Sequence, residues 1–259
     1  MNLQLENKTA LVTGSTKGIG FAIARLLAAE GAKVIVNGRS AEGAHAAAKK
    51  IGPNACGVGA DVSTAAGCAE LVRQLPKVDI LVNNAGIFEP KPFTEIPDAD
   101  WERFYQVNVM SAVRLTRAYL PGMLERNWGR VIFMSSESGV QIPEEMIHYG
   151  MTKAAELALV NGIAQLTKKT GVTVNAVLPG PTASEGVTDF VDKLAAGANQ
   201  TAAEFEKEFF RSVRPTSLLQ RFASVDEVAN MVAYLCSPLA SATNGAAVRV
   251  DGGVLRGTA

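Results

Sequence analysis

The chain has 259 residues, 47% of them hydrophobic and 19% charged, and its 25 lysines and arginines equal its 25 aspartates and glutamates. This length allows a substantial buried core, and the balanced charge gives no reason to expect a nucleic acid or an anionic membrane as partner. No apolar run approaches the roughly 20 residues that span a bilayer, and the first residues lack the pattern of a secretion signal, so we expect a cytoplasmic protein.

Short β-rich apolar runs alternate with Ala-rich helical runs along the chain. The first pair is a buried strand at residues 9–14 and an amphipathic helix at residues 18–31, which Gly31 closes. Further strands are predicted at residues 33–39, 55–62, 78–86, 129–136, 172–180 and 246–253. Further helices are predicted at residues 42–52, 65–75, 98–126 and 148–169. Residues 180–222 are the least strand-like region and are predicted to form an insertion over a site.

The alternation predicts the fold class. Continuous apolar strands separated by helices imply a parallel sheet with helices on both faces, which is a Rossmann-like doubly wound α/β fold. The sequence contains no linker, internal repeat or low-complexity tract, so we expect residues 1–259 to form a single domain.

The three cysteines, Cys56, Cys68 and Cys236, are far apart and form no CxxC pair. Metal sites need closely spaced Cys and His ligands, and an odd number of distant cysteines fits reduced thiols. We therefore expect buried structural thiols and no metal site.

The segment TGSTKGIG, residues 13–20, lies between the first strand and the first helix. In a doubly wound sheet, this turn is where the diphosphate of a dinucleotide meets the amino terminus of a helix. Gly14, Gly18 and Gly20 permit a tight turn, a close backbone approach and close packing of helix on strand. Taken alone, the GxxxGxG spacing also fits a purely structural turn.

Tyr149 and Lys153 are four residues apart on a predicted helix, so both side chains project from one face. A free tyrosine has a pKa of about 10, and a nearby ammonium group favours the phenolate and lowers that pKa. The pair could therefore act in proton transfer, although any helix can carry a solvated Tyr and Lys at this spacing.

Six motifs occur in the order and spacing of the short-chain dehydrogenase/reductase family, which the chain resembles from about residue 8 to residue 253. They are TGSTKGIG, NNAG at 83–86, YQVNVMSA around Asn108, FMSSESG around Ser136, YGMTK at 149–153 and LPGPT at 178–182. The resemblance implies an oxidoreductase in which hydride passes between a nicotinamide and a carbonyl or alcohol carbon, with no metal.

The resemblance also implies a catalytic tetrad. Tyr149 would be the general acid in reduction and the base in oxidation, and Lys153 would also hold the nicotinamide ribose. Ser136 would orient the substrate oxygen, and Asn108 would hold a water that links Lys153 to solvent. The implied cofactor-binding residues are Gly14, Ser15, Thr16, Lys17, Gly18, Ile19, Gly20, Arg39, Asp61, Val62, Asn83, Ala85, Gly86, Tyr149, Lys153, Pro179, Gly180 and Thr182.

Two positions depart from the family pattern. The motif usually reads Tyr-x-x-Ser-Lys, and here Thr152 replaces the serine but keeps a hydroxyl. The family often has a threonine five residues after the proline of the PG motif, where this chain has Ser184. Either Ser184 or Thr182 is then the hydroxyl that meets the cofactor.

The end of the second predicted strand, VIVNGRS, bears on the choice of cofactor. Proteins that bind NAD place an acid there for the ribose hydroxyls, whereas a 2′-phosphate needs positive charge and no carboxylate. Gly38 stands where the family's acid usually lies, Arg39 follows it, and Lys17 adds a second cation. We therefore predict NADP(H), with NAD(H) as the alternative.

The predicted function is the NADP(H)-dependent interconversion of a small-molecule ketone or aldehyde and its alcohol. An NAD-dependent sugar or polyol dehydrogenase is an alternative, disfavoured by Arg39 and favoured if Glu137, Glu144, Glu145 or His148 binds a polar substrate. Otherwise Glu144 and Glu145 form a solvated loop face, and His148 helps to begin the helix. A 3-oxoacyl-[acyl-carrier-protein] reductase is another, disfavoured because the basic positions that grip the carrier are Asn127 and Thr170 here. A non-catalytic dinucleotide-binding regulator is remote, because the tetrad is intact.

Two further expectations concern the surface. Within residues 180–222, Phe205 and Phe209 are spaced for one helical face, which suits a pocket, a core or a subunit interface. The family resemblance implies a homotetramer, with the helices at 99–126 and 148–169 forming one interface.

Overall fold

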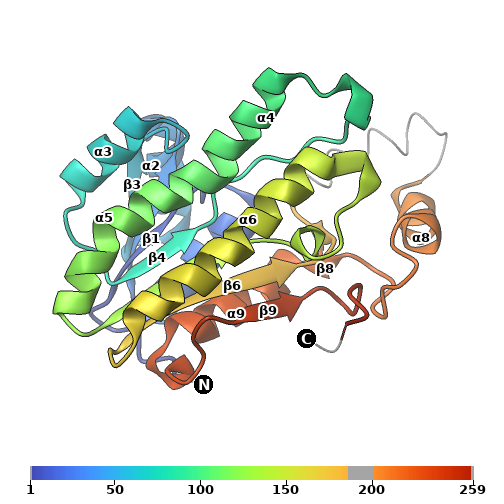
Figure 1. Ribbon diagram of the computed structural model, residues 1–259. Helices are drawn as coiled ribbons and strands as arrows, with labels where there is room; N and C mark the ends of the chain where they lie inside the picture. The colour runs from blue at the N-terminus through green and yellow to red at the C-terminus, as the bar shows by residue number, and fades with distance from the viewer. Residues whose placement is uncertain (1, 186–200, 258–259) are drawn as a thin grey trace.

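The computed structural model describes residues 2–185 and 201–257, and it consists of one parallel sheet between two layers of helices (Figure 1). The strand order is β3-β2-β1-β4-β5-β6-β9, and every neighbouring pair is parallel. The strands are β1 (Thr9–Val12), β2 (Lys33–Gly38), β3 (Ala55–Gly59), β4 (Ile80–Asn83), β5 (Gly129–Met134), β6 (Val172–Pro179) and β9 (Ala247–Val250). The order reverses between β1 and β4, which is where such sheets open a crevice for a ligand.

Helices cover both faces of the sheet. One face carries α1 (Gly18–Ala29), α2 (Ala41–Ile51) and α9 (Val225–Cys236). The other carries α3 (Ala65–Gln74), α5 (Ser111–Glu125) and α6 (Ile147–Ala164), with α4 (Asp98–Phe104) leading into α5 (Figure 1). The shorter elements are η1 (Phe93–Glu95), the π-helical η2 (Tyr105–Met110), η3 (Glu137–Gly139), η4 (Glu144–Met146), η5 (Gln165–Thr167), β7 (Thr182–Ala183), α8 (Ala202–Ser212), β8 (Ala223–Ser224) and η6 (Pro238–Ala240).

Alternate residues of each strand enter opposite cores, as the pleat of a strand requires. In β5, Ile132 and Met134 pack under α1 and α9, whereas Val131 and Phe133 pack under α5 and α6. All four are at most 5% exposed. Burying a side chain of this size contributes about 1.5–3 kcal/mol, so both helical layers are held firmly on the sheet.

The predicted fold class is confirmed, and each predicted strand is present in a shorter form. The helix predicted at residues 98–126 is divided by the π-helical turn η2, and the one predicted at 148–169 ends at residue 164 before η5. Helix α9, which the sequence reasoning did not predict, begins with a capping box between Ser224 and Glu227.

The predicted insertion at residues 180–222 is partly described, since residues 186–200 lie outside the described part of the chain. Within it, β7 pairs in parallel with β8, and α8 begins with a capping box between Thr201 and Glu204. Helix α8 lies beyond the carboxyl ends of β6 and β9 (Figure 1). Phe209 packs against Phe222 and Phe210 with ring centroids 5.2 Å apart, and Phe205 stacks on it at 6.4 Å.

The cysteine prediction is right for two residues and wrong for one. Cys68 and Cys236 are buried free thiols, but Cys56 is an exposed free thiol. Cys56 lies on β3, one of the two edge strands of the sheet. Among residues 2–185 and 201–257, no helix combines the length and the apolar character needed to cross a membrane.

Candidate active site

The glycine-rich loop joins β1 to the amino end of α1, at the carboxyl edge of the sheet. Within residues 2–185 and 201–257 no side chain caps this helix end, and its first turn carries no acidic residue. The free N–H groups of the first turn and the helix dipole together favour an anion. The site therefore suits the diphosphate of a dinucleotide.

The loop adopts a conformation that only glycine allows easily. Gly14 and Gly18 have φ angles of 60° and 61°. A Cβ atom on Gly20 would lie 2.4 Å from Nδ2 of Asn84 and 2.6 Å from the carbonyl oxygen of Gly14. The loop thus closes tightly over the end of β4, and a side chain at Gly20 would open it.

Hydrogen bonds join this loop to the NNAG segment after β4. The Thr13 hydroxyl accepts bonds from the backbone N–H groups of Asn84 and Ala85, both at 2.9 Å. The Asn84 amide donates to the carbonyl oxygens of Thr13 (2.9 Å) and Gly14 (3.0 Å). Sequence reasoning did not single out Thr13 or Asn84, although both lie inside quoted motifs. Asn83, which it did select, turns its amide to Thr116 on α5 at 3.1 Å.

The end of β2 lies against the glycine-rich loop. A Cβ atom on Gly38 would stand 2.5 Å from Cγ2 of Thr16. Arg39 follows Gly38 and Lys17 follows Thr16 in the chain, and both are exposed. The Ser15 hydroxyl is buried and accepts a bond from Asn37 N–H at 3.1 Å, so it holds β2 to the loop.

The structure separates the two candidate hydroxyls after β6. The Thr182 hydroxyl is buried and donates to the carbonyl oxygen of Gly180 at 2.9 Å. Ser184 instead lies beside the glycine-rich loop, since a Cβ atom on Gly18 would be 3.5 Å from its Cβ. Ser184 is therefore the better placed of the two to meet a phosphate at this loop.

The remaining predicted cofactor residues also lie along this edge. Ile19 packs partly against the core, and Val62 is buried after β3. Asp61 is exposed, and its carboxylate accepts bonds from Ser63 N–H (3.0 Å) and hydroxyl (2.7 Å). The others are Ala85 beneath Gly14, Gly86 beside Lys153, and Pro179 and Gly180 at the end of β6.

Three members of the predicted tetrad meet where β5 faces the start of α6. Lys153 Nζ lies 5.7 Å from the ring centroid of Tyr149. Ser136, just after β5, lowers the pKa of Tyr149, and its hydroxyl accepts a bond from Ser138 N–H at 3.1 Å. Lys153 Nζ also donates to the carbonyl oxygen of Met134 at 2.8 Å, which fixes α6 to β5.

Asn108, the fourth member, is fully buried in the π-helical turn η2. Its Oδ1 accepts a bond from Ile87 N–H (2.8 Å), and its Nδ2 donates to the Ile87 carbonyl oxygen (3.0 Å) and the Thr152 hydroxyl (2.9 Å). Thr152 in turn donates to the Tyr149 carbonyl oxygen at 2.7 Å, so the replacement for the usual serine still links η2 to α6. Such π-helical turns are frequent at functional sites.

The charges at the site differ from the expectation for an isolated Tyr and Lys pair. Burial raises the pKa of Tyr149, and this outweighs the lowering by the Lys153 ammonium and the Ser136 hydroxyl. Burial lowers the pKa of Lys153, but the Glu156 carboxylate and Tyr149 raise it above its ordinary value. Glu156 was not predicted from the sequence, and burial raises its own pKa to about 7 despite Lys153.

A buried ion pair connects the segment after α8 to the loop after Ser136. Arg214 Nε lies 3.1 Å from Glu137, and its Nη1 lies 3.3 Å from the more exposed Glu145. Arg214 is a further residue that sequence reasoning did not identify. His148 is fully buried against Phe104, with ring centroids 4.1 Å apart, and neither of its nitrogens has a hydrogen-bond partner among the described residues.

Comparisons with known proteins agree with this geometry. A family model for short chain dehydrogenases matches residues 8–195. An uncharacterised oxidoreductase of Bacillus subtilis is 48% identical over 261 residues, covering 99% of each chain. A 3-oxoacyl-[acyl-carrier-protein] reductase of Aquifex aeolicus is 35% identical, covering 98% of this chain and 100% of that one. The structure of L-sorbose reductase from Gluconobacter frateurii, complexed with NADPH and L-sorbose, has a TM-score of 0.92 at 33% identity, covering 99% and 100%.

Proposed function

This chain belongs to the short-chain dehydrogenase/reductase family of NAD(P)-dependent oxidoreductases that act on CH–OH groups, and we propose that it uses NADP(H) to reduce a small ketone or aldehyde. The observation that carries the proposal is the meeting of Tyr149, Lys153 and Ser136 beside a glycine-rich loop shaped for a dinucleotide. The reverse reaction would oxidise the corresponding alcohol.

Proton transfer at the Tyr149 hydroxyl is the chemistry that the protein itself supplies. A bound nicotinamide would supply the hydride. The Ser136 hydroxyl would hold the substrate oxygen, Tyr149 would donate its proton to that oxygen, and the Lys153 ammonium would stabilise the resulting phenolate. Because the pKa of Tyr149 is raised, the phenol is the dominant form at neutral pH, which favours reduction.

Removal of the phenol hydroxyl tests this role. Tyr149→Phe should slow the reduction of a small activated ketone by about 10²–10⁴-fold, the usual worth of a general acid. Tyr234→Phe is the matched control, because Tyr234 is a partly exposed tyrosine on α9, across the sheet from α6. Cofactor binding should be nearly normal in both variants. Full activity in Tyr149→Phe would show that the mechanism is wrong.

The proposed preference for NADP(H) rests on charge at the end of β2. Gly38 brings no carboxylate, it lies against Thr16, and the residues that follow these two, Arg39 and Lys17, are both exposed cations. The sorbose reductase structure was solved with NADPH, which supports the same preference here. Losing one charged hydrogen bond costs about 1.5–3 kcal/mol, so Arg39→Gln should weaken NADPH binding about 10–150-fold and leave NADH binding unchanged.

Fluorescence titration with each cofactor measures this difference without a substrate. Arg117→Gln, the same change at an exposed arginine on α5, serves as the control. Equal losses for NADPH and NADH in Arg39→Gln would mean that Arg39 does not face the 2′-phosphate. A wild-type preference for NADH would make the polyol or sugar dehydrogenase the favoured function.

A sugar or polyol is the second candidate substrate, supported by the likeness to L-sorbose reductase. A carrier-bound substrate has less support. The Asn127 side chain accepts a bond from Gly171 N–H at 2.7 Å, and the Thr170 hydroxyl donates to the Thr167 carbonyl oxygen at 2.7 Å. Both side chains therefore stabilise the turns before β5 and β6, and neither provides the positive charge that would grip an acidic carrier. Rates with L-sorbose, a simple aryl ketone and an acyl-carrier thioester would rank the three classes.

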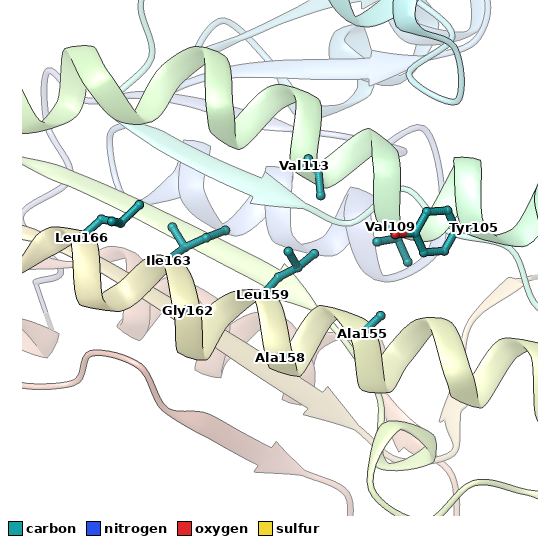
Figure 2. Close-up of a pocket in the computed structure, with 9 residues that line it drawn as sticks. All are labelled: Tyr105, Val109, Val113, Ala155, Ala158, Leu159, Gly162, Ile163 and Leu166. Atoms are coloured by element: carbon teal, nitrogen blue, oxygen red, sulfur yellow. The ribbon is translucent and has the colours of Figure 1, made fainter.

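We also propose that a second copy of the chain covers the outer groove between α5 and α6. Figure 2 shows Val113 facing Leu159 and Ile163 across this groove. Its volume is about 390 Å³, and its lining is Tyr105, Val109, Val113, Ala155, Ala158, Leu159, Gly162, Ile163 and Leu166. Leu166 is 63% exposed, and a homotetramer that forms through these helices would bury this side chain.

Light scattering on the purified protein tests the assembly. Ala158→Glu should dissociate it, because the charge would enter the groove. Ala29→Glu, at an exposed alanine on α1 across the sheet, should leave the mass unchanged. A monomeric wild-type protein would refute the interface.

A further inference from the structure

Glu156 occupies a position on α6 where an apolar residue is expected. It lies one turn after Lys153 and one turn before Val160, on the helix face that packs against the sheet. Its relative exposure is 1%, and that of Lys153 is 4%. Carboxylates are almost never buried to this degree unless they are paired.

The pair is close and bidentate. Lys153 Nζ lies 3.1 Å from Oε2 and 3.2 Å from Oε1 of Glu156, and its third contact is the Met134 carbonyl oxygen at 2.8 Å. The ammonium is therefore held between α6 and β5 by three acceptors. A lysine in a purely structural setting would place its ammonium in water.

Among the residues that the structure describes, few other charges act on this pair. From α6 itself the titratable neighbour is Tyr149, which raises the pKa of Lys153. Glu137 of η3 acts on Tyr149, and its own charge is balanced by Arg214 at 3.1 Å. From η2 the neighbour is Asn108, which is neutral, and from the loop after β4 it is Gly86, which presents only backbone. Glu156 is thus the dominant anion at the Lys153 ammonium.

We propose that Glu156 is the counter-ion of Lys153, a positioning residue that keeps the lysine in its ammonium form and holds Nζ between β5 and Tyr149. The assignment rests on the proposed function only in placing Lys153 at the site of proton transfer. Burial of an ammonium without an anion favours the neutral amine, so the family tetrad in this chain depends on a fifth side chain.

The consequence for the reaction follows from the charge. A neutral Lys153 could not stabilise the Tyr149 phenolate that alcohol oxidation requires. Loss of Glu156 should therefore remove activity first at alkaline pH, where an unpaired lysine gives up its proton. Because Glu156 reaches the reacting atoms only through Lys153, its effect is on the pH profile rather than on substrate contacts.

The test measures the protonation of Lys153 directly in the protein without cofactor. NMR of protein labelled with isotopic lysine follows the Cε signal of Lys153 through a pH titration, and Lys153→Arg identifies that signal by its absence. In Glu156→Gln the pKa of Lys153 should fall by about one unit or more. Glu125→Gln, the same change at an exposed carboxylate before β5, should leave it unchanged.

A second substitution separates charge from shape. Glu156→Asp keeps the carboxylate but is shorter, so it should preserve more of the Lys153 pKa than Glu156→Gln does. If shape alone mattered, Gln would be the better replacement. The pH profile of alcohol oxidation should show the same order, with alkaline activity lost in the Gln variant and partly kept in the Asp variant.

Three results would overturn the proposal. They are an unchanged Lys153 pKa in Glu156→Gln, a better preserved pKa in the Gln than in the Asp variant, and a wild-type Lys153 pKa at or below that of an ordinary lysine. The measurement of the wild-type Lys153 pKa does not depend on the folding of any variant. Because the NMR titration requires no turnover, the counter-ion role can stand even if no substrate is reduced, and it can fail in a fully active enzyme.

Discussion

Replacement of Gly38 by aspartate should move the cofactor preference from NADPH to NADH. Gly38 ends β2, and a Cβ atom there would lie 2.5 Å from Cγ2 of Thr16 and 3.9 Å from Cβ of Ala44. The close contact is with a methyl group at the end of a short side chain, so rotation of Thr16 can relieve it. That adjustment costs about 0.5–1.5 kcal/mol and acts on both cofactors equally.

The charge provides the discrimination. A carboxylate about 4 Å from a phosphate charge costs about 1–4 kcal/mol at an effective dielectric constant between 80 and 20. Together with the cost at Thr16, this should weaken NADPH binding by between about 10-fold and about 10⁴-fold. For NADH, hydrogen bonds from the ribose hydroxyls to the new carboxylate stabilise the complex by about 0.5–1.5 kcal/mol. This offsets the cost at Thr16, so the affinity for NADH should stay nearly constant.

Fluorescence titration of wild type, Gly38→Asp and Gly38→Asn with each cofactor measures these terms. The asparagine variant has the same size and the same contact with Thr16 but no charge, so it isolates the electrostatic part. If Gly38→Asn weakened NADPH binding as much as Gly38→Asp, the effect would be steric. If Gly38→Asp kept the NADPH preference, the 2′-phosphate would not lie at the end of β2.

Three other substitutions probe stability and the cofactor loop. Burial lowers the pKa of His148, so the folded protein should lose stability as the pH falls below the ordinary histidine pKa of 6.5. His148→Phe should flatten this pH dependence of the thermal unfolding temperature, and an unchanged dependence would contradict the reasoning. Arg130→Ala should lower the free energy of unfolding, measured by urea denaturation, by roughly 2–5 kcal/mol. The substitution removes the hydrogen-bond donors to three carbonyl oxygens and the guanidinium that lies over the Trp128 ring. A loss of less than about 1 kcal/mol would refute this. Gly20→Ala should weaken NADPH binding at least about 10-fold, since the new methyl group meets a backbone oxygen at 2.6 Å, and normal binding in a fluorescence titration would be the contrary result.

Local signals in the sequence were enough to predict the framework of the site. The apolar run of β1, the glycines of the loop and the helical period of α1 are adjacent along the chain, so their arrangement follows from local geometry. The four-residue spacing of Tyr149 and Lys153 likewise places them on one helix face in any context. The fold class followed from the alternation of strands and helices, because parallel strands require crossover helices.

The tertiary structure decided what surrounds these groups. Glu156 reads as an ordinary helical carboxylate until α6 is laid on β5, which buries it beside Lys153. Arg214 meets Glu137 across 77 residues of sequence, and Ser184, which follows β6 in the chain, lies beside the glycine-rich loop that follows β1. The pKa of Tyr149 depends on the same packing. The four-residue spacing places an ammonium one turn away from the phenol, whereas the burial that outweighs this ammonium arises only when the helices pack on the sheet.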